Sequence, residues 1–218
     1  MKTVDIDAIY SILKKHVKNY KTPVVDFINI QTRDPFKVLV STILSARTND
    51  STTGAVCERL FKKVTSLDDL GKMSQKELAK LIFPVGFYNT KAKHLKELPH
   101  IIKNSFHNKI PESIDALIKL PGVGRKTANL VVSVAFNKPG ICVDTHVHKI
   151  FNRLGYIKTK TPLETEMTLR KKLPQKYWIP INSMLVSFGQ YLCRPISPHC
   201  SICPIEEYCN KVGVNNSR

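Results

Sequence analysis

The sequence predicts an all-α protein, and two observations lead to that fold class. Apolar residues recur at helical spacing through most of the 218-residue chain, and no segment shows the alternation that a half-buried strand requires. Helix-start signals also recur: Asp34 precedes Pro35, and capping boxes occupy Ser74–Glu77 and Thr161–Glu164. We therefore expect roughly ten helices joined by short loops, without repeats or low-complexity tracts.

The N-terminal segment predicts an amphipathic helix and not a signal peptide. Asp5 is placed to cap this helix and Pro23 to end it. Its apolar residues at helical spacing are Ile6, Ile9, Leu13, Val17 and Tyr20. No apolar stretch of the chain is long enough to cross a bilayer. We therefore expect a soluble cytoplasmic protein that is not secreted, whose cysteines are reduced thiols or metal ligands.

The chain divides into two expected domains. Residues 28–137 form a continuous series of apolar helices, expected to be a six-helix barrel-like domain. Residues 1–27 and 138–218 are expected to form a second helical domain that ends in a Cys- and Pro-rich segment. A cleft between two such lobes is the expected binding site.

The charge is strongly positive, with 34 Lys and Arg against 17 Asp and Glu and a formal net charge of +17. Such an excess indicates an anionic partner, either nucleic acid or an anionic membrane surface. A merely solubilising surface is the alternative. The cations are spread through structured segments and are not gathered in a tail, which favours a partner.

The segment LPGVGRKTA (120–128) lies between two apolar helical runs, and it predicts a helix–hairpin–helix. Gly122 and Gly124 are expected to adopt positive φ and to admit a partner close to the backbone, while Val123 packs back between the helices. Amides at the start of the second helix, followed by Arg125, suit a phosphate group. A tight corner whose glycines serve packing alone is the alternative.

Lys126 and Asp144 are the candidate catalytic residues. Lys126 lies in the first turn of a helix, where the helix dipole, the adjacent Arg125 and any partial burial would disfavour its protonated form. A deprotonated amine is a nucleophile, although a phosphate-binding lysine is the commoner role. Asp144 begins the next helix, which Gly155 is placed to end, and it could simply be an N-cap. It could also orient the amine and stabilise positive charge on a sugar.

Four cysteines, Cys193, Cys200, Cys203 and Cys209, are spaced C-x6-C-x2-C-x5-C. Thiolates this close in sequence suit either a tetrahedral metal ion or a cubane cluster, so zinc is the alternative. Arg194 and His199, which lie between them, can present cations to phosphates. Cys57 and Cys142 lie in apolar contexts and are expected to be buried structural thiols.

Several motifs together resemble the helix–hairpin–helix DNA glycosylase superfamily, most of all its endonuclease III branch. They are LPGVGRKTANLVV, VDTHVHKIFNRLG, ILSARTND, VGFYNTKAKHL and the C-terminal cysteines. The resemblance implies that Lys126 is a Schiff-base nucleophile, that Asp144 is the catalytic aspartate, and that the cysteines hold a [4Fe–4S] cluster. It also implies a monomer that acts on double-stranded DNA containing damaged bases or abasic sites, in association with the nucleoid.

The resemblance further implies two loops that fill the gap left by a flipped base. Arg47 stands where many relatives carry glutamine, and Phe87 where several carry leucine. Arg47 is expected to contact the orphaned base and Phe87 to wedge between bases, unless Phe87 is a core aromatic. His146 is a further expected DNA contact, with capping or packing as its alternative.

The resemblance implies a bifunctional DNA glycosylase and abasic-site lyase that excises oxidised pyrimidines in base excision repair. Two alternatives remain at this point. One is a monofunctional mismatch or adenine glycosylase of the same superfamily, which would not need a nucleophilic Lys126. The other is a non-enzymatic DNA-binding protein that uses only its helix–hairpin–helix.

Overall fold

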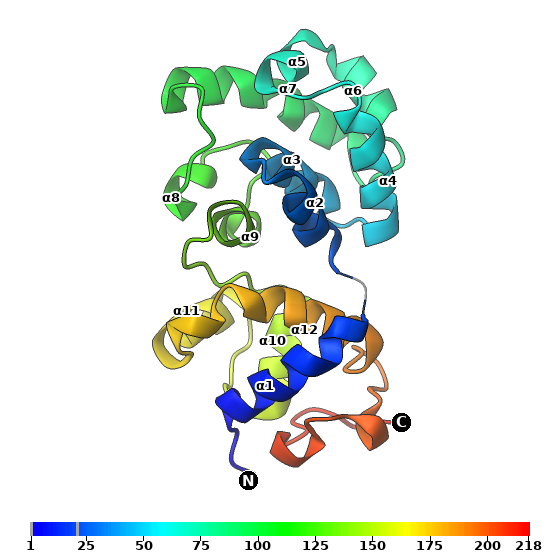
Figure 1. The fold of residues 1–218 in the computed structure, drawn as a ribbon, viewed down its shortest axis with the longest axis vertical. Coiled ribbons are helices and arrows are strands. Elements are labelled where there is room, and N and C mark those ends of the chain that lie inside the picture. Colours follow the sequence, from blue (N-terminus) through cyan, green and yellow to red (C-terminus); the bar gives the residue numbers. More distant parts are fainter. Residues whose placement is uncertain (1, 21) are drawn as a thin grey trace. The chain divides into compact units, whose positions relative to one another are not determined.

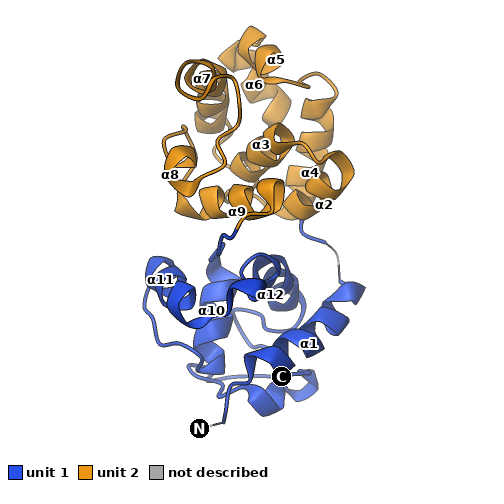
Figure 2. Cartoon of the chain, turned by 60° about the vertical axis from the view of Figure 1, so that its left-hand side comes forward, with its two compact units in different colours: residues 1–23, 139–218 blue, residues 24–138 orange. Residues whose placement is uncertain are grey.

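The structure, a computed structural model, describes residues 2–20 and 22–218, and over these residues it is helical and has no strands. The chain forms two compact units (Figure 2). Unit 1 comprises residues 1–23 and 139–218, and unit 2 comprises Val24–Lys138. The sequence placed the first boundary after residue 27. It falls earlier because Val24 and Val25 are buried in the core of unit 2.

Unit 2 contains six helices of eight or more residues and two shorter ones (Figure 1). The longer helices are α2 (Val24–Thr32), α3 (Pro35–Ser45), α4 (Asp50–Phe61), α6 (Gln75–Ile82), α7 (Tyr88–Phe106) and α9 (Arg125–Phe136). The short ones, α5 (Leu67–Lys72) and α8 (Ile114–Leu117), are additional to the six that the sequence predicts. Helix α3 is the most apolar of the central elements and packs against α2, α4, α7 and α9.

Unit 1 is built from both ends of the chain. Its α-helices are α1 (Ile6–His16), α10 (Thr145–Leu154), α11 (Pro162–Lys172) and α12 (Pro180–Tyr191). Its 3-10 turns are η1 (Val17–Asn19), η2 (Gln175–Tyr177), η3 (Cys200–Ile202) and η4 (Glu206–Tyr208). The Nζ atom of Lys176 and the hydroxyl of Tyr177 both donate to Asp7 Oδ1, so that α1 is bonded to the segment before α12.

The predicted helix starts are confirmed by their hydrogen bonds. Asp34 Oδ1 accepts from the amide of Phe36 at 2.9 Å, and Ser74 and Glu77 form a complete capping box. The hydroxyl of Thr161 accepts from the amide of Glu164 at 3.2 Å. Each bond satisfies an amide that lacks a partner within its helix. Among the described residues, no helix is both long enough and apolar enough to cross a membrane.

Candidate functional site

Helices α8 and α9 and the turn between them form the helix–hairpin–helix that the sequence predicts. Gly122 in this turn has φ +76°, and a Cβ atom built on it would lie 2.7 Å from Nδ1 of His94. Both the backbone conformation and the packing against α7 therefore require glycine here. Val123 is buried in the core of unit 2, as expected.

Gly124 differs from the expectation, because its φ is −85° and not positive. It is the N-cap of α9 and makes no side-chain capping bond. A Cβ atom at this position would meet no other atom within 4 Å. No neighbouring atom among the described residues therefore requires glycine at this position. The absence of a side chain leaves the backbone at the start of α9 open to a close approach from outside.

Lys126 is exposed in the first turn of α9, so the structure does not show the partial burial considered from the sequence. Arg125 is the first residue of the same helix and is half-buried. The first turn contains no acidic residue. Two cationic side chains thus lie at the positive end of the α9 dipole, a position that favours an anionic ligand.

Asp144 is the N-cap of α10 and is only 9% exposed. Its Oδ1 atom accepts a hydrogen bond from the amide of Val147 at 2.8 Å, which confirms the capping role. Capping uses one carboxylate oxygen and leaves the negative charge in place. The segment just before Asp144 is bonded to α12, because the side-chain amide of Asn182 donates to the carbonyl of Cys142 at 2.9 Å.

His146 packs closely on α12. A Cβ atom built on Gly189 would lie 2.2 Å from Nδ1 of His146, so the imidazole ring occupies the space that this glycine leaves. The half-buried ring therefore has a packing role, which was one of the two expected from the sequence. Its contact with DNA stays a prediction.

Arg47 and Phe87, the two residues expected to fill the gap, lie together at the surface of unit 2. The guanidinium carbon of Arg47 is 5.4 Å from the centroid of the Phe87 ring. Phe87 is 62% exposed, which is not the environment of a core aromatic. Both residues have left-handed backbone, with φ 53° for Arg47 and φ 57° for Phe87, which is uncommon outside glycine.

Lys91 is a buried residue of this region that the sequence analysis missed. It is 6% exposed, and its Nζ atom donates to the carbonyls of Leu44 and Ala46 at 2.7 and 2.6 Å. Burial lowers the pKa of Lys91 to about 8. A signal was present in the spacing, because Lys91 lies four residues before Leu95, which is one turn of an α-helix.

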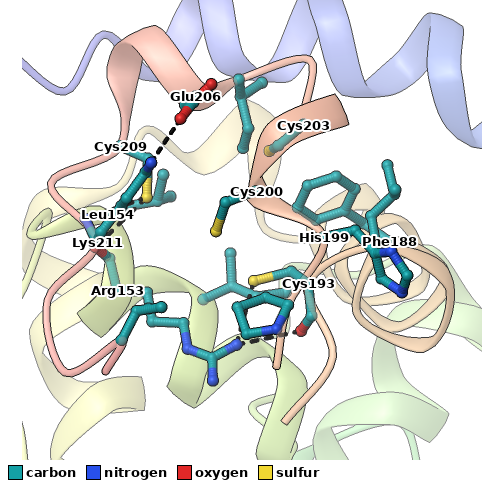
Figure 3. Close-up of a pocket in the computed structure, with 15 residues that line it drawn as sticks. Arg153, Leu154, Phe188, Cys193, His199, Cys200, Cys203, Glu206, Cys209 and Lys211 are labelled. Carbon is teal, nitrogen blue, oxygen red and sulfur yellow. Dashed lines mark hydrogen bonds and ion pairs between the residues drawn. The ribbon is translucent and has the colours of Figure 1, made fainter. Parts of the chain in front are cut away.

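All four cysteines of the C-terminal segment line one pocket in unit 1 (Figure 3). Its walls include Phe188 of α12 and Leu154 of α10. The guanidinium of Arg153 donates to the carbonyls of Arg194 and Pro195 at 2.7 and 2.8 Å, which holds the start of the segment against α10. Arg194 itself is exposed.

The chemistry of this pocket suits a thiolate-bound group. Burial raises the pKa of the Cys193 and Cys209 thiols and raises that of Cys203 to about 11, so the pocket without a cation favours thiols over thiolates. Nε2 of His199, which also lines the pocket, is buried and has no hydrogen-bond partner among the described residues.

The four cysteines are chemically suited to either of two groups. Zinc would need all four sulfurs about 2.3 Å from one point. A cubane cluster binds each cysteine through a different iron and needs a wider set. Within residues 2–20 and 22–218, no three His, Cys, Asp or Glu side chains already form a single-ion site. Cys57 and Cys142 are buried elsewhere, as expected, and burial raises the pKa of Cys57 to about 12.

The fold and the hairpin define a two-unit, all-helical protein of the helix–hairpin–helix class. Comparison with known families identifies it further: residues 40–175 match the HhH-GPD superfamily base excision DNA repair proteins, and the chain belongs to that family. It is 45% identical over 181 residues to "Endonuclease III" of Thermotoga maritima, covering 83% of this chain and 85% of that protein.

Two solved structures are similar over nearly the whole chain. The first is a trapped endonuclease III–DNA covalent intermediate, with 35% identity, a TM-score of 0.83, and coverage of 94% of this chain and 95% of that one. The second is a thermostable thymine-DNA glycosylase, with 26% identity, a TM-score of 0.82 and the same coverage of both chains. The greater identity lies with endonuclease III.

Proposed function

We propose that this DNA glycosylase and abasic-site lyase of base excision repair acts through Lys126 and Asp144 on oxidised pyrimidines in duplex DNA. The activity itself follows from the family and from the endonuclease III relatives. The observation that carries the assignment of residues is the exposed lysine in the first turn of the hairpin helix α9. The lesion class and the residue roles rest on the resemblance and on the local chemistry.

In this mechanism the Nζ atom of Lys126 attacks C1′ of the deoxyribose and displaces the damaged base. The amine must be deprotonated to attack, because only the neutral form has a free electron pair. The product is an imine between Lys126 and the opened sugar. Loss of a proton from C2′ then allows β-elimination, which breaks the strand on the 3′ side of the lesion.

Asp144 supplies the negative charge. As the bond from C1′ to the base breaks, positive charge develops on the sugar, and a carboxylate near it lowers the barrier. Because capping of α10 holds Asp144 through Oδ1, the carboxylate has a defined orientation before substrate binds.

The hairpin binds the DNA backbone. The turn formed by Gly122, Val123 and Gly124 orients the amides at the start of α9 toward a phosphate. Arg125 adds a charge-assisted hydrogen bond. The open space beside Gly124 supports this proposal, because a side chain there would obstruct the phosphate and nothing else. Such contacts position the duplex without reading its sequence. Arg194 and His146 are proposed as further DNA contacts.

Arg47 and Phe87 fill the space that the flipped nucleotide leaves. Their exposure and their contact with each other support this role, since a stacked pair presents a flat apolar ring and a hydrogen-bond donor at one surface. Phe87 enters the base stack, and Arg47 donates to the orphaned base opposite. The protein works as a monomer in the cytoplasm, where the nucleoid lies.

Cys193, Cys200, Cys203 and Cys209 hold one [4Fe–4S] cluster. When bound, it supplies a cross-link for a segment that is poor in apolar residues, and no step of the excision reaction needs a redox group. The pocket that all four cysteines share supports this assignment. The cluster stabilises the fold of the segment and so presents Arg194 to the DNA.

Borohydride trapping tests the proposed chemistry. Protein, DNA with a defined oxidised pyrimidine, and borohydride are mixed, and covalent adducts are resolved by denaturing electrophoresis. A bifunctional enzyme gives a trapped adduct and a cut strand. The thymine-DNA glycosylase similarity leaves one competing activity, a monofunctional glycosylase, which would release the base from a mismatch without an adduct. Absence of both adduct and base release would contradict the proposed enzyme.

Metal analysis tests the cluster. The purified protein is expected to be brown with about four irons per chain. Cys203→Ser is expected to lower iron content and solubility, because the segment depends on the cluster to fold. Cys57→Ser, in unit 2, is the matched control and is expected to keep the iron. Zinc without iron would contradict the cluster, and an iron-free protein with normal folding and DNA affinity would contradict its structural role.

A further inference from the structure

The side chain of Lys91 joins helix α7 to the loop that follows α3. Its Nζ atom donates to three oxygens of that segment: the carbonyls of Leu44 and Ala46, and the hydroxyl of Thr48 at 3.2 Å. The two carbonyls belong to the C-terminal end of α3, where the last carbonyls lack partners within the helix. An ammonium group has three donors, so the donors and acceptors match in number.

The same loop is bonded to the loop that precedes α7. The amide of Gly86 donates to the hydroxyl of Thr48 at 3.1 Å. A Cβ atom built on Gly86 would lie 2.6 Å from the carbonyl oxygen of Arg47, so the two backbones are in direct contact. Thr48 therefore bonds to both Lys91 and Gly86. Residues 46–49 and 83–87, named here the loop pair, form a single packed unit on α7.

The loop pair holds Arg47 and Phe87 in conformations that neither adopts readily alone. Their left-handed backbone angles are unfavourable for residues with a Cβ atom. Surrounding contacts must offset that cost. Beside Arg47, such contacts include the bonds of Lys91 to Ala46 and Thr48, the residues on either side of Arg47 in the chain.

A buried ammonium is itself unfavourable unless it is fully bonded. Lys91 is buried, yet its lowered pKa of about 8 still leaves it mostly protonated at neutral pH. A leucine or methionine would fill the same space without a desolvation penalty, although it would leave the carbonyls of α3 unbonded. Lys91 therefore fixes the backbone of the loop through directional hydrogen bonds, which an apolar residue of the same size would not provide.

We propose that Lys91 is a positioning residue that locks the loop pair, so that Arg47 and Phe87 enter the DNA together as one preformed wedge. This inference rests on the gap-filling role given to Arg47 and Phe87 under the proposed function. Lys91 touches neither the reacting sugar nor the base, and it acts through the backbone of residues 44–48. Its loss is expected to impair lesion recognition and to leave imine chemistry on an exposed abasic site largely intact.

The test compares Lys91→Met with Lys96→Met. Lys96 lies on the same helix and donates to a single carbonyl, that of Gly71, which makes it a matched control. Two dissociation constants are measured for each protein, one with a duplex containing a tetrahydrofuran abasic-site analogue and one with the undamaged duplex. Borohydride trapping at saturating single-stranded DNA with an abasic site reports the chemistry alone, and thermal unfolding reports the fold.

The affinity ratio is the affinity for the damaged duplex divided by the affinity for the undamaged duplex. Lys91→Met is expected to lower this ratio about tenfold, equivalent to about 1.4 kcal/mol. The trapping rate should change less than about threefold, the range of ordinary context effects. Lys96→Met should keep the wild-type ratio. An unchanged ratio in a folded Lys91→Met protein would overturn the proposal, as would an equal loss of ratio in the control.

A double-mutant cycle with Arg47→Ala separates positioning from general loosening. If Lys91 acts through Arg47, adding Lys91→Met to Arg47→Ala should lower the ratio much less than it does in the wild type. Full additivity of the two losses would overturn the proposal. Thr48→Val is a substitution in the loop itself, and it removes the hydrogen bonds of Thr48 with Lys91 and Gly86. This variant provides the test if Lys91→Met does not fold. A folded Thr48→Val protein with an unchanged ratio would overturn the locked loop pair.

The single variants Arg47→Ala and Phe87→Ala distinguish this proposal from the function on which it rests. If both keep the wild-type ratio, the gap-filling role itself is wrong. If either loses it while Lys91→Met and Thr48→Val keep it, gap filling stands and the positioning role of Lys91 is wrong.

Discussion

The guanidinium of Arg47 lies over the ring of Phe87, 5.4 Å from its centroid, although the two residues are far apart in the chain. Each extends from a different loop, and each has left-handed backbone. Exposed aromatic rings with a stacked cation are suited to bases, which stack on both kinds of group. The two predicted gap-filling positions are therefore one surface feature and not two.

Replacement of the Arg47 side chain is expected to affect recognition more than chemistry. Arg47→Ala should weaken binding to damaged duplex by about tenfold and to undamaged duplex by about twofold, since only the former has a gap to fill. Competition binding with both duplexes at one fixed salt concentration measures this. Equal weakening on both, together with a smaller dependence of affinity on salt, would identify Arg47 as a phosphate contact.

Lys126→Gln is expected to abolish base release, strand cutting and borohydride trapping. The change removes the amine but keeps the DNA-backbone contacts proposed for Gly122, Gly124 and Arg125, so the dissociation constant for DNA should rise less than about tenfold. Arg125→Gln is the matched control, which should weaken binding and retain trapping. Trapping that survives in Lys126→Gln would show that the nucleophile is another residue.

Asp144→Asn separates the capping role from the charge. Asparagine is as good an N-cap as aspartate, so the unfolding free energy should change by less than about 1 kcal/mol. Base release should fall by about a hundredfold or more, because the charge proposed to stabilise the sugar is gone. Single-turnover excision and thermal unfolding measure the two effects. A near wild-type rate would leave Asp144 as a helix cap only.

The two hairpin glycines should respond differently to the same substitution. Gly122→Ala is expected to lower the unfolding free energy by about 1–3 kcal/mol, because the position has positive φ and the new Cβ atom meets His94. Gly124→Ala meets nothing in the chain and should leave stability unchanged while weakening DNA binding. Unfolding and binding are measured on both variants. Unaltered DNA affinity in Gly124→Ala would contradict a close backbone contact at this position.

Asp26 in α2 should make stability depend on pH. Burial, with a smaller effect from the nearby Asp50, raises the pKa of Asp26 to about 6 from 3.8. Between these values the folded state binds more protons than the unfolded state, so this contribution to stability is present at low pH and is lost as pH rises through about 6. Asp26→Asn should therefore stabilise the protein at pH 7.5, by at most about 3 kcal/mol.

Denaturant unfolding of wild type and Asp26→Asn at several pH values checks this. The gain should shrink toward zero as pH falls to about 4, near the unfolded-state pKa. Asp115→Asn is the control, since Asp115 is exposed. A gain that is constant with pH would show that burial of the charge is not its source.

The sequence by itself determined the features that depend on neighbours along the chain. Helix caps at Asp34, Ser74 and Thr161 follow from bonds spanning two or three residues. The hairpin turn is likewise local. Helical periodicity alone predicts which faces are buried, and hence the all-α class. The candidate residues Lys126, Asp144 and the four cysteines were found through motif spacing and resemblance, and their roles stay predictions.

Only the tertiary structure decided the relationships between distant segments. It placed Lys91 beneath the loop after α3, Arg47 beside Phe87, and His94 against Gly122. It also showed that Gly122 is required by packing whereas Gly124 is not. Contacts of this kind depend on how helices pack, and the period of a helix specifies which face is buried without specifying what that face meets.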